Sequence, residues 1–217
     1  MRFLDRSEAG RALAARLTTY RDRDDVIVLA LPRGGVPVAF EIARALQAPL
    51  DVFLVRKLGV PGHPELAMGA IASGGVRVLS RDIIDELRIP QPAVEEVAAR
   101  EAVELERRDR LYRGDRPRPA LQGRVVILVD DGLATGATME AAIVAARQHQ
   151  PARVVVAAPV GARDTCRRLS AIADEVVCAD MPEPFQAVGL WYARFDQTTD
   201  DEVIALLNEP ALVSRWR

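Results

Sequence analysis

Histidine and cysteine are scarce in this sequence, with two residues of each among 217. The two cysteines, Cys166 and Cys178, do not have a metal-binding spacing. With only two histidines beside them, the chain offers too few nitrogen and sulfur ligands for a protein-held zinc site. The low cysteine content also favours a reduced protein, which we expect to be cytoplasmic.

Long apolar runs and a strong net charge are missing as well. No apolar stretch reaches the roughly 18 residues that a membrane-spanning helix needs, and the charged N-terminus lacks a secretory signal pattern. The formal net charge is -2, which argues against a nucleic-acid partner. The sequence has neither a P-loop lysine motif nor a Gly-x-Gly-x-x-Gly run, so nothing indicates an NTPase or a dinucleotide-binding protein.

Short apolar runs alternate with helical patterns along the chain, which predicts an α/β fold with a parallel sheet and flanking crossover helices. The length fits one domain with a small accessory region, and 49% hydrophobic residues can form a substantial core. We expect strands at 26–31, 51–56, 76–79, 125–129, 153–158 and 175–178. We expect helices at 7–20, 38–46, 81–87, 92–112, 138–149, 163–171 and 200–207.

The most informative segment runs from Val125 to Met139. Its first five residues are apolar and predict a strand that is buried on both faces. Two adjacent carboxylates follow, and a loop of small residues then opens a helix with Thr135 or Thr138 as its N-cap. Ligands of open α/β sheets bind where strands end and helices begin. Because a helix N-terminus offers unpaired N–H groups, this loop suits a phosphate.

The adjacent carboxylates of Asp130 and Asp131 need a separate explanation, since they would repel a phosphate. They suit the hydroxyls of a ribose or a magnesium ion instead. The alternative is a simple Asp-Asp-Gly turn at a strand end, because Asp-Gly is a common turn signal. The apolar strand before them and the Ala-Thr-Gly-Ala-Thr run after them favour a sugar-phosphate site.

Residues 125–139 closely resemble the phosphoribosyl-diphosphate (PRPP) signature of type I phosphoribosyltransferases. The resemblance implies that Asp130 and Asp131 hold the ribose 2′- and 3′-hydroxyls and contact a metal ion, directly or through water. It also implies that the loop holds the 5′-phosphate, through Ala134, Thr135, Gly136, Ala137 and Thr138. The 6-oxopurine enzymes usually carry an Asp at the position of Ala134, so the motif is most similar to the adenine and orotate branches.

A second match consists of Arg33, Gly34 and Gly35, which follow the predicted strand at 26–31. It resembles the pyrophosphate loop of the same family. The two glycines would permit positive φ angles and let main-chain N–H groups converge on an anion. Arg33 either adds a charged donor or points into solvent. The alternative is an ordinary Gly-Gly connection between a strand and a helix.

Lys57 is the single lysine among 29 Lys and Arg residues, which hints that an ammonium group is needed there. The resemblance places a basic residue here, near the pyrophosphate. The Pro and Gly content of 60–71 predicts a loop. In the family a mobile loop at this place closes over the reacting centre, where Glu65 or His63 would assist proton transfer. The alternatives are a solvated strand end and an ordinary surface loop.

Two further segments each have two interpretations. The helix over 93–113 carries Glu and Arg at helical spacing, which predicts a solvated face or an arginine that reaches the PRPP of a neighbouring subunit. The segment 180–195 is rich in aromatics. Because type I enzymes bind the base under a hood, Phe185 and Trp191 are candidates to stack on it, or else they pack within the hood or a dimer. The whole pattern resembles a bacterial phosphoribosyltransferase group whose hood matches none of the adenine, orotate or uracil enzymes.

The resemblance implies one phosphoribosyltransferase-like domain over 1–217, with a core at about 20–180 and a hood formed by the N-terminus and about 180–217. It implies transfer of 5-phosphoribosyl from PRPP to a small nitrogenous base with release of pyrophosphate, in a homodimer with Mg²⁺ as cofactor. The implied catalytic residues are Lys57, Glu65, Asp130 and Asp131. The alternative is a regulatory protein that senses PRPP or a nucleotide without turnover, because fold does not fix function.

Overall fold

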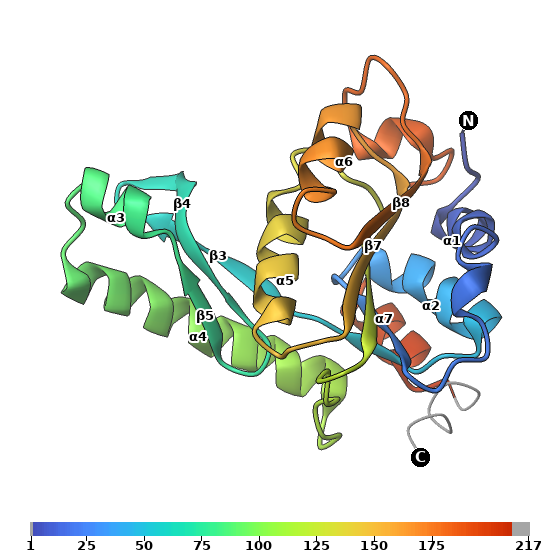
Figure 1. Cartoon of the computed structure of the whole chain (residues 1–217), viewed down its shortest axis with the longest axis horizontal. Coiled ribbons are helices and arrows are strands. Elements are labelled where there is room, and N and C mark those ends of the chain that lie inside the picture. Colours follow the sequence, from blue (N-terminus) through green and yellow to red (C-terminus); the bar gives the residue numbers. More distant parts are fainter. Residues whose placement is uncertain (1, 210–217) are drawn as a thin grey trace.

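The structure is a computed structural model of the whole chain, of which residues 2–209 are described, apart from the side chain of Glu65. Five parallel strands form the main sheet in the order β2-β1-β6-β7-β8 (Figure 1). Their bounds are β1 Val26–Ala30, β2 Leu50–Val52, β6 Val125–Val129, β7 Arg153–Val160 and β8 Glu175–Asp180. The central strands β1 and β6 are apolar and buried throughout, as a sheet covered on both faces requires. The predicted α/β fold is confirmed.

Helices cover both faces of this sheet. The helices α1 (Arg6–Ala14) and α2 (Gly35–Leu46) pack on one face, and α5 (Ala137–Arg147) and α6 (Arg163–Leu169) on the other. Alternate residues of β1 divide between the two layers, with Val28 facing α2 and Leu29 facing α5. The last helix, α7 (Asp200–Leu207), contacts α2 and α4 (Gln91–Arg113). The carboxyl ends of the central strands therefore open between two helical layers.

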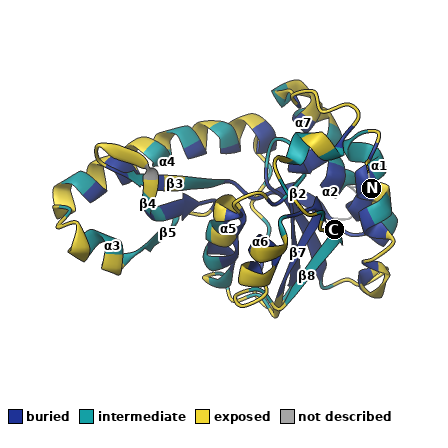
Figure 2. Ribbon diagram, turned by 90° about the horizontal axis from the view of Figure 1, so that it is seen from above, coloured by how far each residue is buried: buried dark blue, intermediate teal, exposed yellow. Residues whose placement is uncertain are grey.

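A second, antiparallel sheet of β3 (Val55–Val60), β4 (His63–Ala72) and β5 (Val76–Leu79) projects from the main sheet. It is followed by α3 (Arg81–Glu86), and α4 (Gln91–Arg113) runs along it (Figures 1 and 2). We call residues 55–90 the arm.

The arm corrects two predictions. A single strand over 51–56 is wrong, because the chain leaves the main sheet after Val52 and enters the second sheet at Val55. A loop over 60–71 is also wrong, because only Pro61 and Gly62 form the turn, with φ +80° at Gly62. The rest pairs as strand β4 with β3 and β5. The neighbouring antiparallel strands satisfy the main chain on both sides of β4, whereas the Pro and Gly content indicated only a loop.

The predicted helix over 7–20 is shorter than expected. The helix α1 ends at Ala14, and a short 3₁₀ turn covers Thr18–Tyr20. The adjacent β-branched Thr18 and Thr19 weaken the helical conformation there. The other six predicted helices are present to within three residues at each end. None of the described helices is long and apolar enough to cross a membrane.

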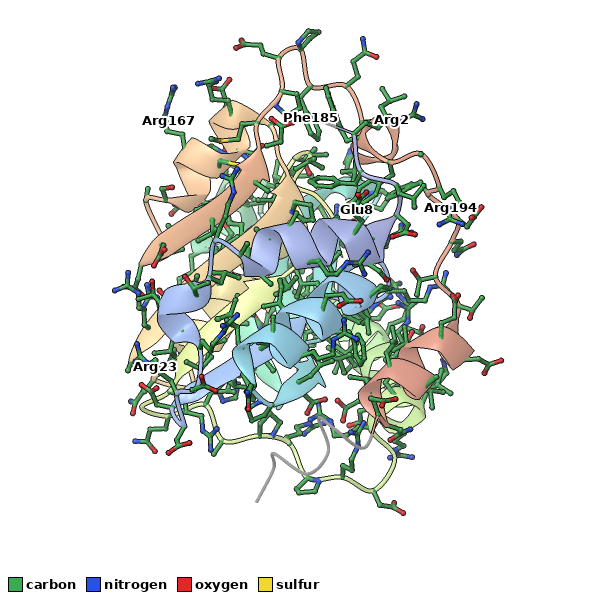
Figure 3. The ribbon with its side chains drawn as sticks, turned by 90° about the vertical axis from the view of Figure 1, so that its right-hand side faces the viewer. Arg2, Glu8, Arg23, Arg167, Phe185 and Arg194 are labelled. Carbon is green, nitrogen blue, oxygen red and sulfur yellow. The ribbon has the colours of Figure 1, made fainter. Side chains whose placement is uncertain are left out.

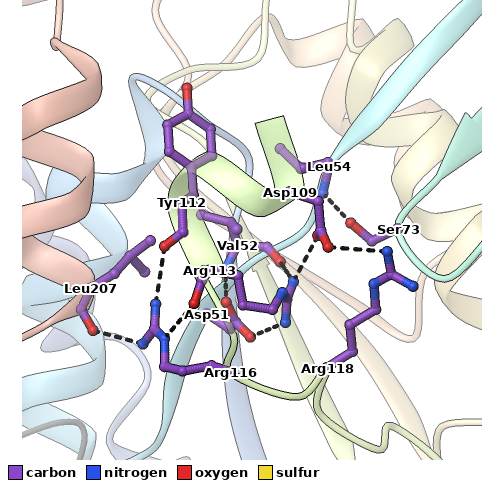
Figure 4. A network of polar contacts seen from close by, with 10 residues as sticks. All are labelled: Asp51, Val52, Leu54, Ser73, Asp109, Tyr112, Arg113, Arg116, Arg118 and Leu207. Atoms are coloured by element: carbon purple, nitrogen blue, oxygen red, sulfur yellow. Dashed lines mark hydrogen bonds and ion pairs between the residues drawn. The ribbon is translucent and has the colours of Figure 1, made fainter. Parts of the chain in front are cut away.

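A buried polar network fastens the end of α4 to β2 (Figure 4). The Arg113 side chain is 3% exposed and pairs with Asp51 of β2 and, at 3.3 Å, with Asp109 one turn earlier. Arg113 therefore does not belong to the solvated face that the sequence predicts for 93–113. Arg107, which pairs with Glu104 at 2.7 Å on the exposed side of the helix, does belong to it.

The first residues of the chain and the segment after β8 lie together and form what we call the hood, which in the described residues comprises 2–5 and 181–198. Phe3 and Tyr192 pair in a parallel bridge, and the N–H of Phe3 donates to the carbonyl of Trp191 at 2.8 Å. Arg2 and Phe185 lie at the same end of the molecule (Figure 3). The predicted hood extends to 217, but α7 (Asp200–Leu207) packs against α2 and α4 instead, and 210–217 lie outside the described residues.

Candidate active site

The carboxyl ends of β1 and β6 lie side by side because the two strands pair in register along their whole length. The loops that follow them are consequently in contact. A Cβ atom added to Gly34 would lie 2.0 Å from Oδ2 of Asp131, and one added to Gly35 would lie 2.6 Å from the carbonyl oxygen of Val129. The structure thus brings together the two motifs that the sequence singles out, and their contact leaves no room for side chains at either glycine.

The reason for the two glycines differs from the one predicted. Gly34 has φ -59° and ψ -32°, which is the right-handed helical region, and Gly35 is the first residue of α2. Neither has a positive φ, so the expected left-handed conformation is wrong. What the loop requires is the missing Cβ atom rather than the conformational freedom of glycine. The peptide bond between Pro32 and Arg33 is cis.

Asp130 and Asp131 are two neighbouring carboxylates in a largely buried position. Burial raises the pKa of Asp130 well above its usual range, and the neighbouring charge of Asp131 raises it further. Burial also raises the pKa of Asp131, against the opposing effect of the Arg6 guanidinium, whose Nε lies 2.8 Å from Oδ2 of Asp131. The Arg6 guanidinium alone does not neutralise both carboxylates. The pair therefore favours a ligand that brings hydroxyl donors or a cation.

The same carboxylates are the residues suited to magnesium. Among residues 2–209, no group of three or more His, Cys, Asp or Glu side chains could hold a metal ion by itself. Mg²⁺ keeps several waters and is usually bound by one or two carboxylates together with substrate phosphates. Asp130 and Asp131 fit that donor set, and they would hold the ion only together with a phosphorylated ligand.

The loop after Asp131 leads into α5 through Gly136, which has φ +74° and is the N-cap of the helix. No side chain caps α5, so the predicted capping by Thr135 or Thr138 is wrong. The left-handed turn at Gly136 places the N-cap on a residue without a side chain. The first N–H groups of the helix are therefore open to an anion. Around them lie four exposed residues: Ala134, Thr135, Ala137 and Thr138.

Two side chains of helix α6 donate hydrogen bonds to this loop. Thr165 Oγ1 donates to the carbonyl of Ala134 at 2.6 Å, and Arg168 Nη2 donates to the carbonyl of Thr135 at 2.7 Å. These bonds hold the carbonyls away from the helix start, so that N–H groups rather than carbonyl oxygens face a ligand. The sequence gives no signal for Thr165 or Arg168, because each lies more than thirty residues from its partner.

Arg33 points toward α7. Its Nη1 lies 3.6 Å from Oδ1 of Asp200, and that oxygen also accepts a hydrogen bond from the Tyr112 hydroxyl at 2.5 Å. Burial and this hydrogen bond to Asp200 raise the pKa of Tyr112 to about 12, so the hydroxyl remains a donor at neutral pH. The Arg33 side chain is 33% exposed, and a long, exposed pair of this kind holds it only weakly.

A cavity of about 700 Å³ lies between β3, α4 and the start of α5. Arg56, Lys57 and Thr138 line it, and Arg56 also pairs with Glu101 of α4 at 2.5 Å. A smaller cavity of about 30 Å³ is lined by Arg56 and Thr138 together with Pro32 and Arg108. Arg56 thus lies between the two candidate loops, whereas Lys57 is exposed at the larger cavity. Sequence reasoning missed Arg56, because only the single lysine stands out among many arginines.

The two proton-transfer candidates lie on the arm. His63 is exposed at the start of β4, beside the hairpin turn. The side chain of Glu65 lies outside the described part of the chain. The role of either residue in proton transfer stays a prediction.

In the hood, Phe185 and Trp191 are partly buried and pack against a cluster that includes Phe3, Val160 and Tyr192. This is the hood packing that the sequence left as an alternative, and stacking on a base stays a prediction. Sequence reasoning missed Tyr192 itself. Its hydroxyl donates to the main-chain carbonyl of Asp131 at 2.6 Å, so the hood is bonded directly to the candidate ribose site.

The family model of the phosphoribosyl transferase domain matches residues 4–192. The chain belongs to the phosphoribosyl transferase family. The match covers both loops, the arm and the hood from residue 4 as far as Tyr192.

Relatives of this chain include the protein Rv0571c of Mycobacterium tuberculosis, which is 52% identical over 206 residues, covering 95% of this chain and 46% of that one. The chain therefore spans about half the length of this relative. The crystal structure of TT1426 from Thermus thermophilus matches with a TM-score of 0.87 and 48% identity, over 95% of this chain and 98% of that one. The AQ2163 protein from Aquifex aeolicus, with a TM-score of 0.50 and 13% identity over 85% of this chain and 78% of that one, shares the fold alone.

Proposed function

We propose that this phosphoribosyl transferase moves the 5-phosphoribosyl group of PRPP to a nitrogenous base and releases pyrophosphate. The observation that carries the proposal is the contact between two loops at the carboxyl ends of β1 and β6. The Gly34 loop touches the carboxylate of Asp131, and the uncapped start of α5 follows within a few residues. A phosphorylated ribose with a pyrophosphate at C1′ needs these three features next to one another.

Each feature has one part of the ligand to hold. Asp130 and Asp131 accept hydrogen bonds from the ribose hydroxyls, and their negative charge favours the cationic character that develops at C1′ when the bond to pyrophosphate breaks. The exposed loop 134–138 donates main-chain N–H groups to the 5′-phosphate. The main chain of Gly34, with the side chains of Arg33, Arg56 and Lys57, would surround the departing pyrophosphate. The N–H of Gly35 donates to the carbonyl of Leu31 at 3.2 Å instead.

Magnesium, when bound with PRPP, would neutralise pyrophosphate oxygens, with Asp130 and Asp131 holding it directly or through water. Proton transfer to or from the base falls to Glu65 or His63 when the arm lies over the site. The base would occupy the hood side of C1′, where Phe185 and Trp191 offer aromatic faces. Ala134 lacks the carboxylate that the 6-oxopurine enzymes place at this position, which disfavours hypoxanthine and guanine as acceptors.

The test is a pyrophosphate-release assay. The chain is incubated with PRPP and Mg²⁺ and, one at a time, with purine, pyrimidine and other heterocyclic bases, and pyrophosphate is measured with a coupled enzyme. We expect release with at least one base, and none from the Asp130→Asn/Asp131→Asn variant. Tight PRPP binding without release with any base would favour a PRPP sensor. Absence of both binding and release would refute the proposal.

A further inference from the structure

Arg6 is a buried cation that joins the hood to the candidate ribose site, and none of the site motifs contains it. Its Nε lies 2.8 Å from Oδ2 of Asp131, and its Nη1 donates to the carbonyl of Asp196 at 2.6 Å. Its guanidinium carbon lies 4.0 Å from the centre of the Phe195 ring, which itself stacks on Tyr192 at 5.0 Å. Only 12% of the Arg6 side chain is exposed. One guanidinium thus makes an ion pair, a main-chain hydrogen bond and a ring contact.

This combination requires arginine. A guanidinium is planar, carries several donors in fixed directions and can stack on a ring while donating in its own plane. A lysine at the same position could neutralise Asp131, but its single ammonium could not also reach Asp196 and cover Phe195. The contacts therefore require the planar shape and the donor directions of a guanidinium, in addition to its positive charge.

The pair of Arg6 and Asp131 lies directly against the pyrophosphate loop. A Cβ atom at Gly34 would be 3.3 Å from Nε of Arg6 and 2.0 Å from Oδ2 of Asp131. The Oδ2 atom is thus enclosed by the loop and the guanidinium. A ribose hydroxyl would donate to a lone pair of the Asp131 carboxylate that Arg6 does not use. The direction of that lone pair depends on what holds Oδ2.

We infer that Arg6 is a positioning residue for ribose recognition: it holds the Asp131 carboxylate with one oxygen turned to the hood, so that the other accepts a ribose hydroxyl. The inference rests on the proposed function. Through Phe195 and Asp196 the same guanidinium links that carboxylate to the hood, where the acceptor base would bind. The ligand class that depends on Arg6 is therefore a phosphorylated sugar with its 2′- and 3′-hydroxyls intact.

Calorimetric titration with ribose 5-phosphate and with 2-deoxyribose 5-phosphate, in the presence of Mg²⁺, tests this assignment. The two ligands differ by one hydroxyl, so the ratio of their dissociation constants reports how well the carboxylates receive it. A hydrogen bond to a charged group predicts a preference of roughly tenfold to a hundredfold for ribose 5-phosphate in the unaltered chain. We expect Arg6→Ala to reduce this preference to about threefold or less, and Arg6→Lys to retain an intermediate value.

The matched control is Arg11→Ala. Arg11 lies on the same helix and pairs with Glu41 at 3.2 Å, and Glu41 keeps Arg44 as a second partner at 2.6 Å. This variant should retain the full preference. Thermal unfolding of every variant identifies those that are folded, and Arg6→Lys and Arg6→Gln replace Arg6→Ala if the alanine variant does not fold.

The outcomes separate two kinds of failure. If the folded Arg6 variants bind both sugars more weakly but keep the preference, Arg6 has only a structural role and the inference is refuted. If the unaltered chain binds neither sugar phosphate nor PRPP, the proposed function fails, and the inference fails with it. Loss of the preference in the Arg6 variants and its retention in Arg11→Ala would support the assignment.

Discussion

Substitution of Gly34 by alanine tests the contact on which the site is built. The φ of -59° at Gly34 suits alanine, so the smaller freedom of the unfolded chain alone would stabilise the protein by about 0.4–1 kcal/mol. The new Cβ atom would, however, lie 2.0 Å from Oδ2 and 2.7 Å from Cγ of Asp131. The short aspartate side chain can move away only by giving up Arg6.

Two destabilising effects set the size of the expected change in stability. Overpacking of a tight contact costs about 1–3 kcal/mol, and loss of one partner from a buried ion pair costs about 3–5 kcal/mol. With partial relaxation of the loop, we expect Gly34→Ala to lower the free energy of unfolding by about 2–4 kcal/mol. In a chain of this size that corresponds to a decrease in Tm of roughly 5–15 °C. Binding of ribose 5-phosphate should weaken at least tenfold.

Urea unfolding followed by circular dichroism measures the stability, and calorimetry measures the binding. The control is Gly62→Ala, which has open space around the Cβ position but φ +80°. Backbone strain should cost that variant about 1 kcal/mol without affecting ligand binding. A Gly34→Ala variant as stable as the unaltered chain, with unchanged ribose 5-phosphate affinity, would refute the close contact between the two loops.

Three further predictions concern Asp130, Arg113 and Thr165. Because the folded-state pKa of Asp130 is raised by burial and by Asp131, its ionised form destabilises the folded chain at high pH. This destabilisation decreases as the pH falls from the raised pKa toward the usual value of 3.8 and is absent below it. Asp130→Asn should therefore increase the free energy of unfolding near pH 8 by about 1 kcal/mol or more, and much less near pH 4; a pH-independent difference in urea unfolding would contradict this. Arg113→Ala leaves Asp51 buried without its main partner and should cost about 3–5 kcal/mol, so a variant with an unchanged urea midpoint would be at odds with the network in Figure 4. Thr165→Val removes the hydrogen bond to Ala134 at nearly constant volume and should weaken ribose 5-phosphate binding about threefold to tenfold; equal affinities by calorimetry would show that α6 does not shape the loop.

Local patterns made much of the main sheet and both site loops predictable. The runs 26–30 and 125–129 are apolar and short, and each is soon followed by charged residues and glycines, which are uncommon in a hydrophobic core of this kind. Because both are parallel strands of one sheet, their carboxyl ends lie at the same edge. The resemblance to the phosphoribosyltransferase motifs assigned the Gly34 loop and Asp130 to one site, although the prediction misjudged why the glycines are there.

Contacts that leave no local pattern were not predictable from one sequence. The arm forms because β4 finds partners on both sides, whereas the local composition of 60–71 indicated only a loop. Arg6 lies 125 residues from Asp131 and is one of many arginines, so no local pattern distinguishes it. The hydroxyl of Tyr192 reaches a main-chain carbonyl 61 residues away, and main-chain acceptors carry no signature in the sequence.

We propose that the chain holds PRPP at the carboxyl ends of β1 and β6. Calorimetric titration of the unaltered chain and of the Asp130→Asn/Asp131→Asn variant with PRPP and Mg²⁺ tests it most directly. We predict saturable binding by the unaltered chain and at least a hundredfold loss of affinity in the variant, since two charged acceptors are removed. Equal affinities of the two proteins for PRPP would contradict the proposal that Asp130 and Asp131 bind it.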